Sequence, residues 1–437
     1  MDIKKKLIKI YNSALKKTSP RQIVRDNVLF KENRLHIKNR SFHFEKIFVA
    51  GFGKASCTMA QGIEDSIPAH LIEGAVITKY GHSVPLSKIQ IFEASHPLPD
   101  ENSLKATQNI IQYLAKATKN DLVIFLISGG GSSLLEMPRK GITLLDFQKI
   151  TDLLISSGAC INEINIIRKH LSSVKGGGLA CLAHPAPFIS LILSDVIGSD
   201  LSSIASGPTV RDPSTFEDCR KIIEKYNLTM KTPEAVKDLI LKGKNGQIED
   251  TPSPEDSVFK DSFNFVLSDN EIFCKIISDE AKKETFNSIY LKTPLTTSTA
   301  EELIKGLPEL IKLYTSSSPK LLILGGEITL NITEDKTGLG GRNQHLTLLF
   351  TRDILPLYPD IFAMFASTDG TDGPTDASGG FSNRYLLEKC QDRQELERSI
   401  ENYDSYNFLR KYDELFITGP TGNNVNDVSL IYLPAYS

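Results

Sequence analysis

The sequence has no marked excess of charge of either sign, no long apolar run and no paired cysteine motif. Its 437 residues include 50 Lys and Arg against 53 Asp and Glu, a formal net charge of −3. This balance gives no electrostatic reason to expect a nucleic acid partner. No apolar run reaches the length that spans a bilayer, so we expect no membrane segment. The six cysteines are scattered without a C-x-x-C pair, which argues against a zinc site or disulfide framework and fits a reducing cytoplasm.

Several catalytic signatures are also missing. The stretch GFGKAS, residues 51–56, contains G-x-G but lacks the third glycine of a dinucleotide fingerprint and the spacing of a P-loop. The next apolar stretch ends in Lys79, where a dinucleotide enzyme usually has an acidic residue for the ribose. No G-x-S-x-G elbow of a serine hydrolase is present. The sequence therefore weakens a nicotinamide-dependent function and disfavours a serine hydrolase.

What is present indicates a soluble globular protein of two or three domains, with 40% hydrophobic and 24% charged residues. Strands and helices alternate in both halves, which predicts two α/β domains with largely parallel sheets. We place the first domain at residues 1–243, a polar, proline-containing linker at 244–262, and a second, smaller domain at 263–437. The basic amphipathic start, residues 1–17, predicts a surface helix; a transit peptide or a membrane-surface helix is the alternative.

A strand and a glycine loop form the most distinctive stretch, residues 121–138. An apolar run suited to a buried strand leads into Ser128, three glycines (Gly129, Gly130 and Gly131) and two serines, Ser132 and Ser133. A strand, a glycine loop and a helix N-terminus together present backbone N–H groups to an anion. A tight strand-to-helix turn without a ligand is the alternative.

A second loop of this kind contains Gly51, Gly53 and Lys54. The Lys54 ammonium is placed to reach a phosphate bound at the loop, although a solvated lysine would also satisfy the pattern. His96 lies in a proline-containing loop, where a histidine can meet a ligand but is more often structural.

Cations and a carboxylate follow in residues 161–195. Arg168 and Lys175 are seven residues apart and share a helix face if the helix persists that far. Two cations beside a glycine loop suit an acidic substrate or phosphates; a solvated basic face is the alternative. Asp195 follows a buried strand, and ligands of open α/β sheets bind at the carboxyl ends of strands. Asp195 could accept a proton from a substrate hydroxyl or hold a metal.

The second half repeats these features. A strand is interrupted by Gly325, Gly326 and Glu327, GLGGRN (residues 338–343) opens a helix, and a later loop carries Asp369, Asp372 and Asp376. We interpret so many glycine-rich strand ends as sites where a ligand needs access to the backbone. Cations, carboxylates and glycine loops together are the set that phosphoryl transfer requires.

At these residues the chain resembles the class II glycerate kinases, whose C-terminal part is named for the MOFRL motif. The resemblance extends from about residue 46 to 433 and is carried by GFGKAS, EASHPLPDE, ISGGGSSLL, NIIRKHLSSVKGGGLA, LSDVIGSDLSSIASGPTV, GGE, GGRNQ, STDGTDGPTDASG and TGPTGNNVND. It implies a kinase that uses ATP and Mg²⁺ to make 2-phosphoglycerate from D-glycerate. It also implies a Rossmann-like, doubly wound N-terminal domain, a smaller α/β domain and an active site in the cleft between them.

The resemblance assigns expected roles to individual residues. The family's essential lysine, aspartate and arginine fall on Lys54, Asp195 and Arg342. Lys54 and Arg342 would hold phosphate or the substrate carboxylate, and Asp195 would be the proton acceptor or a metal partner. The other expected contacts are nucleotide at Gly51, Gly53, residues 128–133, Gly325, Gly326 and Glu327; substrate at Arg168, Lys175 and Asn343; and metal at Asp195, Asp369 and Asp372. The sequence departs from the family pattern at His345, Gly380 and Asn423, where glutamate, alanine and threonine are usual.

Two other functions remain open at this stage. Members of this family have also been labelled hydroxypyruvate reductases, which would use NAD(P)H. A non-catalytic protein that binds a sugar acid or a nucleotide is a further alternative. We expect small-molecule partners, no nucleic acid, no membrane, and a monomer or homodimer.

Overall fold

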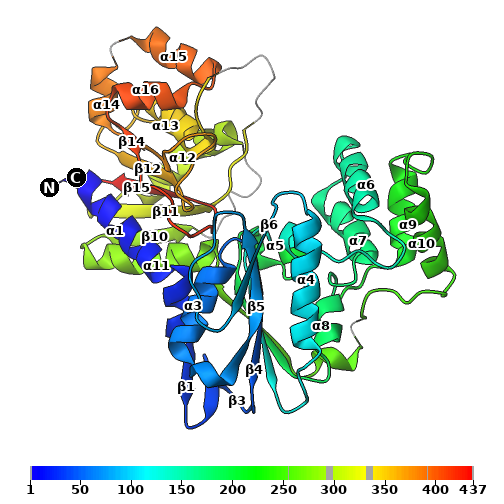
Figure 1. Ribbon diagram of the computed structural model, residues 1–437. Coiled ribbons are helices and arrows are strands. Elements are labelled where there is room, and N and C mark those ends of the chain that lie inside the picture. The colour runs from blue at the N-terminus through cyan, green and yellow to red at the C-terminus, as the bar shows by residue number, and fades with distance from the viewer. Residues whose placement is uncertain (1, 254, 292–298, 331–337, 391, 436–437) are drawn as a thin grey trace. The chain divides into compact units, whose positions relative to one another are not determined.

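The structure is a computed structural model that describes residues 2–253, 255–291, 299–330, 338–390 and 392–435 (Figure 1). The chain forms two compact units. We call Pro20–Leu267 the N-terminal unit, and Met1–Ser19 with Ser268–Ser437 the C-terminal unit. None of the described helices is long and apolar enough to cross a membrane.

This division differs from the boundaries expected from the sequence. Residues 1–19 belong to the C-terminal unit, and residues 244–262 belong to the N-terminal unit rather than forming a linker. The cause is burial: Phe259, within the expected linker, is 6% exposed and packs in the core of the N-terminal unit. The polar, proline-containing composition of residues 244–262 predicted a linker, but the segment packs as part of the N-terminal unit.

The N-terminal unit is built on a six-stranded sheet in the order β6-β5-β4-β7-β8-β9. Each neighbouring pair from β6 to β8 is parallel. Strands β4, β7 and β8 are six-residue, largely apolar segments whose residues are all buried. The strands are β4 (Ile47–Phe52), β5 (Ile72–Lys79), β6 (Gln90–Ala94), β7 (Leu122–Ile127), β8 (Phe188–Leu193) and β9 (Ser262–Ser268).

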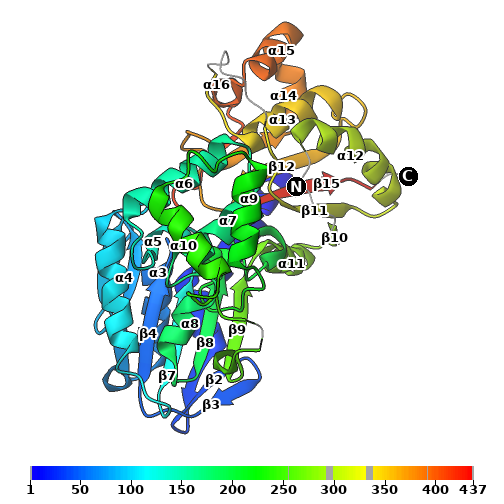
Figure 2. The same ribbon diagram turned by 90° about the vertical axis from the view of Figure 1, so that its right-hand side faces the viewer.

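Helices cover both faces of this sheet (Figures 1 and 2). Phe48 and Phe125 face a core that includes α4 and α8, whereas Val49 and Ile124 face a core that includes α2 and α3. Alternate residues of one strand thus enter opposite cores, as a strand buried on both sides requires. The helices are α2 (Pro20–Asn27), α3 (Ser56–Ser66), α4 (Glu101–Leu114), α5 (Gly131–Leu134) and α8 (Gly178–Ala183).

Two smaller parts complete the N-terminal unit. Four helices bury a separate apolar cluster around Phe147 and Phe216; they are α6 (Leu144–Ser156), α7 (Ile161–Leu171), α9 (Phe216–Lys225) and α10 (Glu234–Lys244). An antiparallel meander precedes β4 and consists of β1 (Val28–Lys31), β2 (Arg34–Ile37) and β3 (Arg40–Phe42).

The C-terminal unit has a mixed sheet in the order β10-β11-β15-β12-β13-β14, which corrects the expectation of a largely parallel one. β10 and β11 are parallel, but the other four pairs are antiparallel. The reason is that the last strand returns between β11 and β12 and runs against both. The strands are β10 (Asn287–Leu291), β11 (Lys320–Gly326), β12 (Phe362–Ser367), β13 (Gly379–Ser382), β14 (Leu415–Phe416) and β15 (Asp427–Leu433).

Helices also cover both faces of this second sheet. One face packs against α12 (Ala300–Tyr314), α13 (Arg342–Asp353), α14 (Arg384–Lys389), α15 (Arg393–Glu401) and α16 (Ser405–Lys411). The other packs against α11 (Asn270–Lys283) and α1 (Ile3–Lys17). Figure 1 shows α1, at the blue end of the chain, beside α11.

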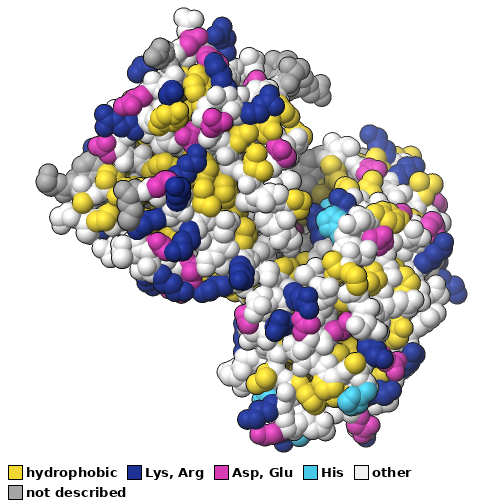
Figure 3. Space-filling model, turned by 60° about the vertical axis from the view of Figure 1, so that its left-hand side comes forward, with side chains coloured by type: hydrophobic (Ala, Val, Ile, Leu, Met, Phe, Trp, Pro, Cys, Tyr) yellow, Lys and Arg dark blue, Asp and Glu magenta, His cyan; other side chains and the backbone are white. Residues whose placement is uncertain are grey.

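The basic start of the chain is therefore an integral helix, as the surface-helix interpretation expected. Leu7, Ile10, Tyr11 and Ala14 of α1 are buried. Lys9 and Lys17 pair with Glu284 and Glu280, each at 2.6 Å. Opposite charges lie interspersed in the same way over the face displayed in Figure 3.

Candidate functional site

The loop after β4 and the loop after β7 are joined through Lys54. The Lys54 N–H donates to the Gly129 carbonyl at 2.9 Å, and the Ala55 N–H donates to Ser128 Oγ at 3.0 Å. Gly53 has a φ of 126° and packs so closely on Ser128 that a Cβ would overlap it. The two glycine loops singled out in the sequence are thus one structural feature.

Three chemically active side chains surround the glycines after β7. A Cβ on Gly129 would overlap the Asp195 carboxylate. Gly130 has a φ of 83°, and a Cβ there would lie 2.8 Å from His96 Cδ2 and 3.3 Å from Lys54 Cγ. Lys54, His96 and Asp195 therefore converge on one loop, as expected for Lys54 and Asp195 from their places at strand ends.

His96 is the residue of this group that the sequence left undecided. Burial, with Lys54 and Lys79 nearby, lowers the pKa of His96 to about 4. The imidazole is consequently neutral near pH 7 and offers one donor and one acceptor beside the Lys54 ammonium.

Helix α7 and the SGPT turn close another side of the loop. Arg168 Nη2 donates to the Ser132 carbonyl at 3.1 Å. The hydroxyls of Ser132 and Ser206 lie 2.5 Å apart, and Ser206 Oγ donates to Asn165 Oδ1 at 3.2 Å. The sequence singled out Arg168 as a substrate contact but did not single out Asn165 or Ser206 as site residues; the run SGP after the Asp195 loop was the available signal.

Lys175 does not share a helix face with Arg168, because the helix does not persist as far as the prediction required. Helix α7 ends at Leu171, and the Lys175 side chain is fully buried. Its ammonium lies 3.1 Å from Glu136 Oε2 and donates to the Leu135 carbonyl at 2.6 Å. Burial lowers the pKa of Lys175 to about 8 against the opposing effect of Glu136. Lys175 is an internal ion-pair partner rather than a side chain presented to substrate.

In the C-terminal unit, Arg342 is held by two carboxylates. It opens α13, and its Nε lies 2.6 Å from Asp427 Oδ2 while Nη2 donates to Asp427 Oδ1 at 3.2 Å. Nη1 donates to Glu327, which follows β11. Asp427 was missed by the sequence reasoning, although it stands at the start of the last strand in the motif TGPTGNNVND. Burial raises the pKa of Asp427 to about 7, while Arg342 acts to lower it.

Asp372 caps α13 and is engaged by protein groups. Its Oδ1 accepts from the Asn343 N–H at 3.1 Å and from Asn343 Nδ2 at 3.2 Å, and its Oδ2 accepts from the Gln344 N–H at 2.8 Å. Asp372 is 2% exposed. The contacts of Asp372 and Asn343 are therefore those of a helix cap, not those expected of a metal ligand and a substrate ligand.

Asp369 organises a turn rather than a cluster of carboxylates. Its Oδ1 accepts from Ser367 Oγ and from the Thr371 N–H, each at 2.9 Å. Among the described residues, no group of three or more His, Cys, Asp or Glu side chains is arranged to hold a metal ion. Mg²⁺, however, commonly uses one or two carboxylates together with substrate phosphates. Asp195, beside the glycine loop, fits that smaller requirement.

Several glycines expected to expose backbone to a ligand are instead packed against protein. A Cβ on Gly325 would overlap Asn270, one on Gly341 would overlap Asp372, and one on Gly51 would lie 2.5 Å from Val76. Gly326 has a φ of 148° within β11. Close packing accounts for these glycines, so glycine-rich strand ends alone do not mark the site.

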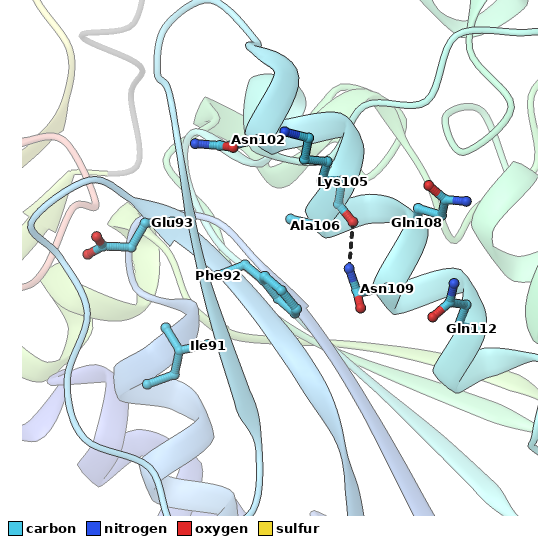
Figure 4. A pocket seen from close by; sticks show the side chains of 9 residues that line it. All are labelled: Ile91, Phe92, Glu93, Asn102, Lys105, Ala106, Gln108, Asn109 and Gln112. Atoms are coloured by element: carbon cyan, nitrogen blue, oxygen red, sulfur yellow. Dashed lines mark hydrogen bonds between the residues drawn. The ribbon is translucent and has the colours of Figure 1, made fainter.

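A polar cavity of about 600 Å³ lies elsewhere in the N-terminal unit, between strand β6 and helix α4 (Figure 4). Phe92 points towards the helix, where Asn102, Lys105 and Asn109 present polar groups. None of the expected site residues lines it.

The fold and the loop geometry define a two-unit α/β protein that gathers a lysine, an aspartate and glycine-loop backbone at the strand ends of one unit, and a carboxylate-bound arginine in the other. Residues 6–241 match the family described as "Domain of unknown function (DUF4147)", and residues 320–427 match the MOFRL family. The chain belongs to this DUF4147–MOFRL family, the class II glycerate kinases.

Named relatives cover nearly the whole chain. The chain is 38% identical to a glycerate 2-kinase of Pyrococcus horikoshii over 98% of this chain and 97% of that protein. It is 38% identical to a D-glycerate 2-kinase of Thermotoga maritima over 88% and 90% of the two chains. It is also 38% identical to a putative hydroxypyruvate reductase of Agrobacterium vitis over 88% and 98%.

Solved structures agree with the fold. A Pyrococcus horikoshii protein superposes with a TM-score of 0.89 at 36% identity, covering 100% of this chain and 99% of that one. The glycerate kinase of Thermotoga maritima superposes with a TM-score of 0.86 at 35% identity, covering 99% of each.

Proposed function

We propose that the protein transfers the γ-phosphoryl group of ATP to the 2-hydroxyl of D-glycerate, giving ADP and 2-phospho-D-glycerate. The observation that carries this proposal is the convergence of Lys54 and Asp195 on the loop of residues 128–133, in a chain that belongs to the glycerate kinase family. Phosphoryl transfer depends mainly on positioning and on stabilising the charge of the migrating group.

Lys54 supplies positive charge to the phosphates. It is placed to do so because its backbone is fixed by Gly129 and its side chain borders Gly130. The loop backbone and the Ser132 and Ser133 side chains position the nucleotide. His96, neutral near pH 7, contributes a hydrogen bond without adding a second charge. Arg168 supports the loop through the Ser132 carbonyl.

The hydroxyl oxygen of glycerate bonds to the γ-phosphorus as the bond to the β–γ bridging oxygen breaks, and the hydroxyl proton must be accepted. Asp195 takes this proton or binds Mg²⁺, which neutralises phosphate charge when it is present. Titration with Mg²⁺ separates the roles. If Asp195 is a metal ligand, the Asp195→Asn variant should need a higher Mg²⁺ concentration for activity. If Asp195 is the base, the variant should have a lowered kcat and an unchanged Mg²⁺ requirement.

Arg342 provides a further cation for a phosphate or for the glycerate carboxylate. Closure of the units around substrate would exclude water from the reaction. Scattering curves that do not change on addition of glycerate and a nucleotide analogue would contradict closure.

The name of the Agrobacterium vitis relative keeps a hydroxypyruvate reductase as the second candidate. Against it, Lys79 ends β5, where an enzyme binding a dinucleotide usually presents an acid to the ribose. The deciding experiment mixes the protein with D-glycerate, ATP and Mg²⁺ and measures ADP. Oxidation of NADH that depends on hydroxypyruvate, without ADP formation, would overturn the kinase proposal. Ligand binding without turnover would favour the non-catalytic alternative.

A further inference from the structure

The two carboxylates that hold Arg342 differ in their surroundings. The Asp427 side chain is 7% exposed, whereas the Glu327 side chain is 43% exposed and that of Arg342 is 30% exposed. Asp427 takes the Nε and Nη2 side of the guanidinium, and Glu327 takes Nη1. Asp427 therefore makes a buried contact that combines one hydrogen bond, from Nη2, with an ion pair at Nε, whereas Glu327 makes a single contact that is open to solvent.

The backbone fixes Asp427 on both sides. β15 is an interior strand, and Asp427 is paired in register with Gly326 of β11 and with Ser367 of β12. Its carbonyl also accepts from Asn270 Nδ2 at 2.9 Å. A carboxylate anchored in this way loses little conformational entropy when it binds a guanidinium, because its own position is already set.

We propose that Asp427 is a positioning residue for the reaction: it fixes the Nε–Nη2 side of Arg342, so that Nη1 can exchange Glu327 for an anionic oxygen of the substrates. This inference rests on the proposed function. The planar guanidinium makes such a division possible, since one side can stay bound while another donor changes partner. Lysine could not do so, because its ammonium is a point charge without a fixed fork.

Asp427→Asn and Glu327→Gln form a matched pair of variants, since each removes one negative charge from a partner of the same arginine. We expect Asp427→Asn to lower kcat by about a hundredfold, the scale of losing one transition-state charge partner. We expect Glu327→Gln to lower kcat less than about tenfold, as for exposed ion pairs. Equal losses, or a larger loss in Glu327→Gln, would overturn the proposal.

The KM values of Glu327→Gln identify which anion replaces Glu327. A change in KM for glycerate assigns Nη1 to the substrate carboxylate, and a change in KM for ATP assigns it to a phosphate. Unchanged KM values for both substrates would contradict exchange at Nη1.

Chemical rescue provides a readout that a purely structural role of Asp427 would not affect. Millimolar guanidinium should restore activity to Arg342→Ala in assays at alkaline pH, where Asp427 is ionised and its anchored carboxylate can hold the free cation. Rescue should persist in Arg342→Ala/Glu327→Gln and disappear in Arg342→Ala/Asp427→Asn. Rescue of both double variants, or of none of the three, would overturn the proposal.

Two controls separate this inference from its premises. If Asp427→Asn does not fold, the Arg342→Ala/Asp427→Asn variant still carries the rescue test, since removing both partners leaves no unpaired charge at that contact. If the wild-type protein forms no ADP from ATP and D-glycerate, the proposed function fails. If it does form ADP and Arg342→Ala is as active as the wild type, only the inference fails.

Discussion

The backbone N–H of Lys54 donates a 2.9 Å hydrogen bond to the carbonyl oxygen of Gly129. This bond links the loops that follow β4 and β7, which are neighbouring parallel strands. The glycine loop therefore fixes the position of the start of the Lys54 side chain. A substitution that moves one of the two loops should also move the other.

Removal of the Lys54 ammonium should lower kcat/KM by about a hundredfold or more, as loss of a transition-state charge partner does. We expect losses of the same scale for Asp195→Asn and Arg342→Ala. Steady-state ADP release measures all three variants against Lys119→Ala, a control at an exposed lysine of the N-terminal unit. Turnover like that of the wild type would remove the substituted residue from the proposed site.

Gly129→Ala should impair catalysis although it replaces no charged residue. The added Cβ would overlap the Asp195 carboxylate, so the carboxylate or the loop must move, and displacement of a reacting group is costly in rate. Gly306→Ala is the matched control, because a Cβ there meets no atom within 4 Å and Gly306 lies within helix α12. That control should keep its activity and gain up to about 1 kcal/mol of unfolding free energy. Normal activity in Gly129→Ala would contradict the arrangement.

Deletion of residues 2–19 should destabilise the C-terminal unit and leave the N-terminal unit largely protected. Tyr11 lies fully buried among residues of this unit, and its hydroxyl donates to the Ser367 carbonyl at 2.7 Å. Hydrogen exchange of the truncated chain should show lost protection in β11, β12 and β15. The milder variant Tyr11→Phe, which removes one buried hydrogen bond, should cost about 1–3 kcal/mol. Loss of protection centred on β4 and β7 instead would argue against this assignment of α1.

His345 should make the C-terminal unit sensitive to acid. The residue is 2% exposed, and burial lowers its pKa from 6.5 to about 4, with Arg352 acting in the same direction and Glu301 in the opposite one. Between these two values the unfolded chain binds more protons than the folded one, so stability falls as the pH drops from 6.5 to 4.

The loss attributable to His345 should reach up to about 3 kcal/mol, at 1.36 kcal/mol per pKa unit. His345→Phe removes the titration while keeping a ring against Tyr403, on which His345 stacks at 4.7 Å between centroids. Thermal melts of both proteins from pH 7 to pH 4 make the comparison. Parallel pH profiles for the two would show that His345 does not contribute to the acid sensitivity.

The sequence predicted the parts of the fold that depend on local pattern. The largely apolar six-residue segments of β4, β7 and β8 predicted buried parallel strands. Thr143 and Asp146 predicted the start of α6, where both hydrogen bonds of the capping box are present. The places of Lys54 and Asp195 followed from the rule that parallel strands bring their carboxyl ends to one edge of a sheet.

Features that depend on distant parts of the chain were not predictable in this way. Lys175 looks like a second basic residue on a helix, but its partner Glu136 is 39 positions earlier and the helix stops before reaching it. Asp427 reaches Arg342 because β15 returns between β11 and β12, and no local sequence pattern specifies that return. Glycines packed against protein look the same in sequence as glycines beside chemically active side chains, as Gly341 (against Asp372) and Gly130 (against His96 and Lys54) illustrate.

The docking of α1 on the C-terminal unit has a consequence for synthesis. Its packing partners Phe273 and Phe416 are translated more than 250 residues later, whereas Pro20–Leu267 forms a compact unit of its own. Helix α1 therefore has no complete packing surface for its apolar stripe until α11 and the strands of the C-terminal unit have been made. During that interval its uncovered apolar residues are exposed to non-native association.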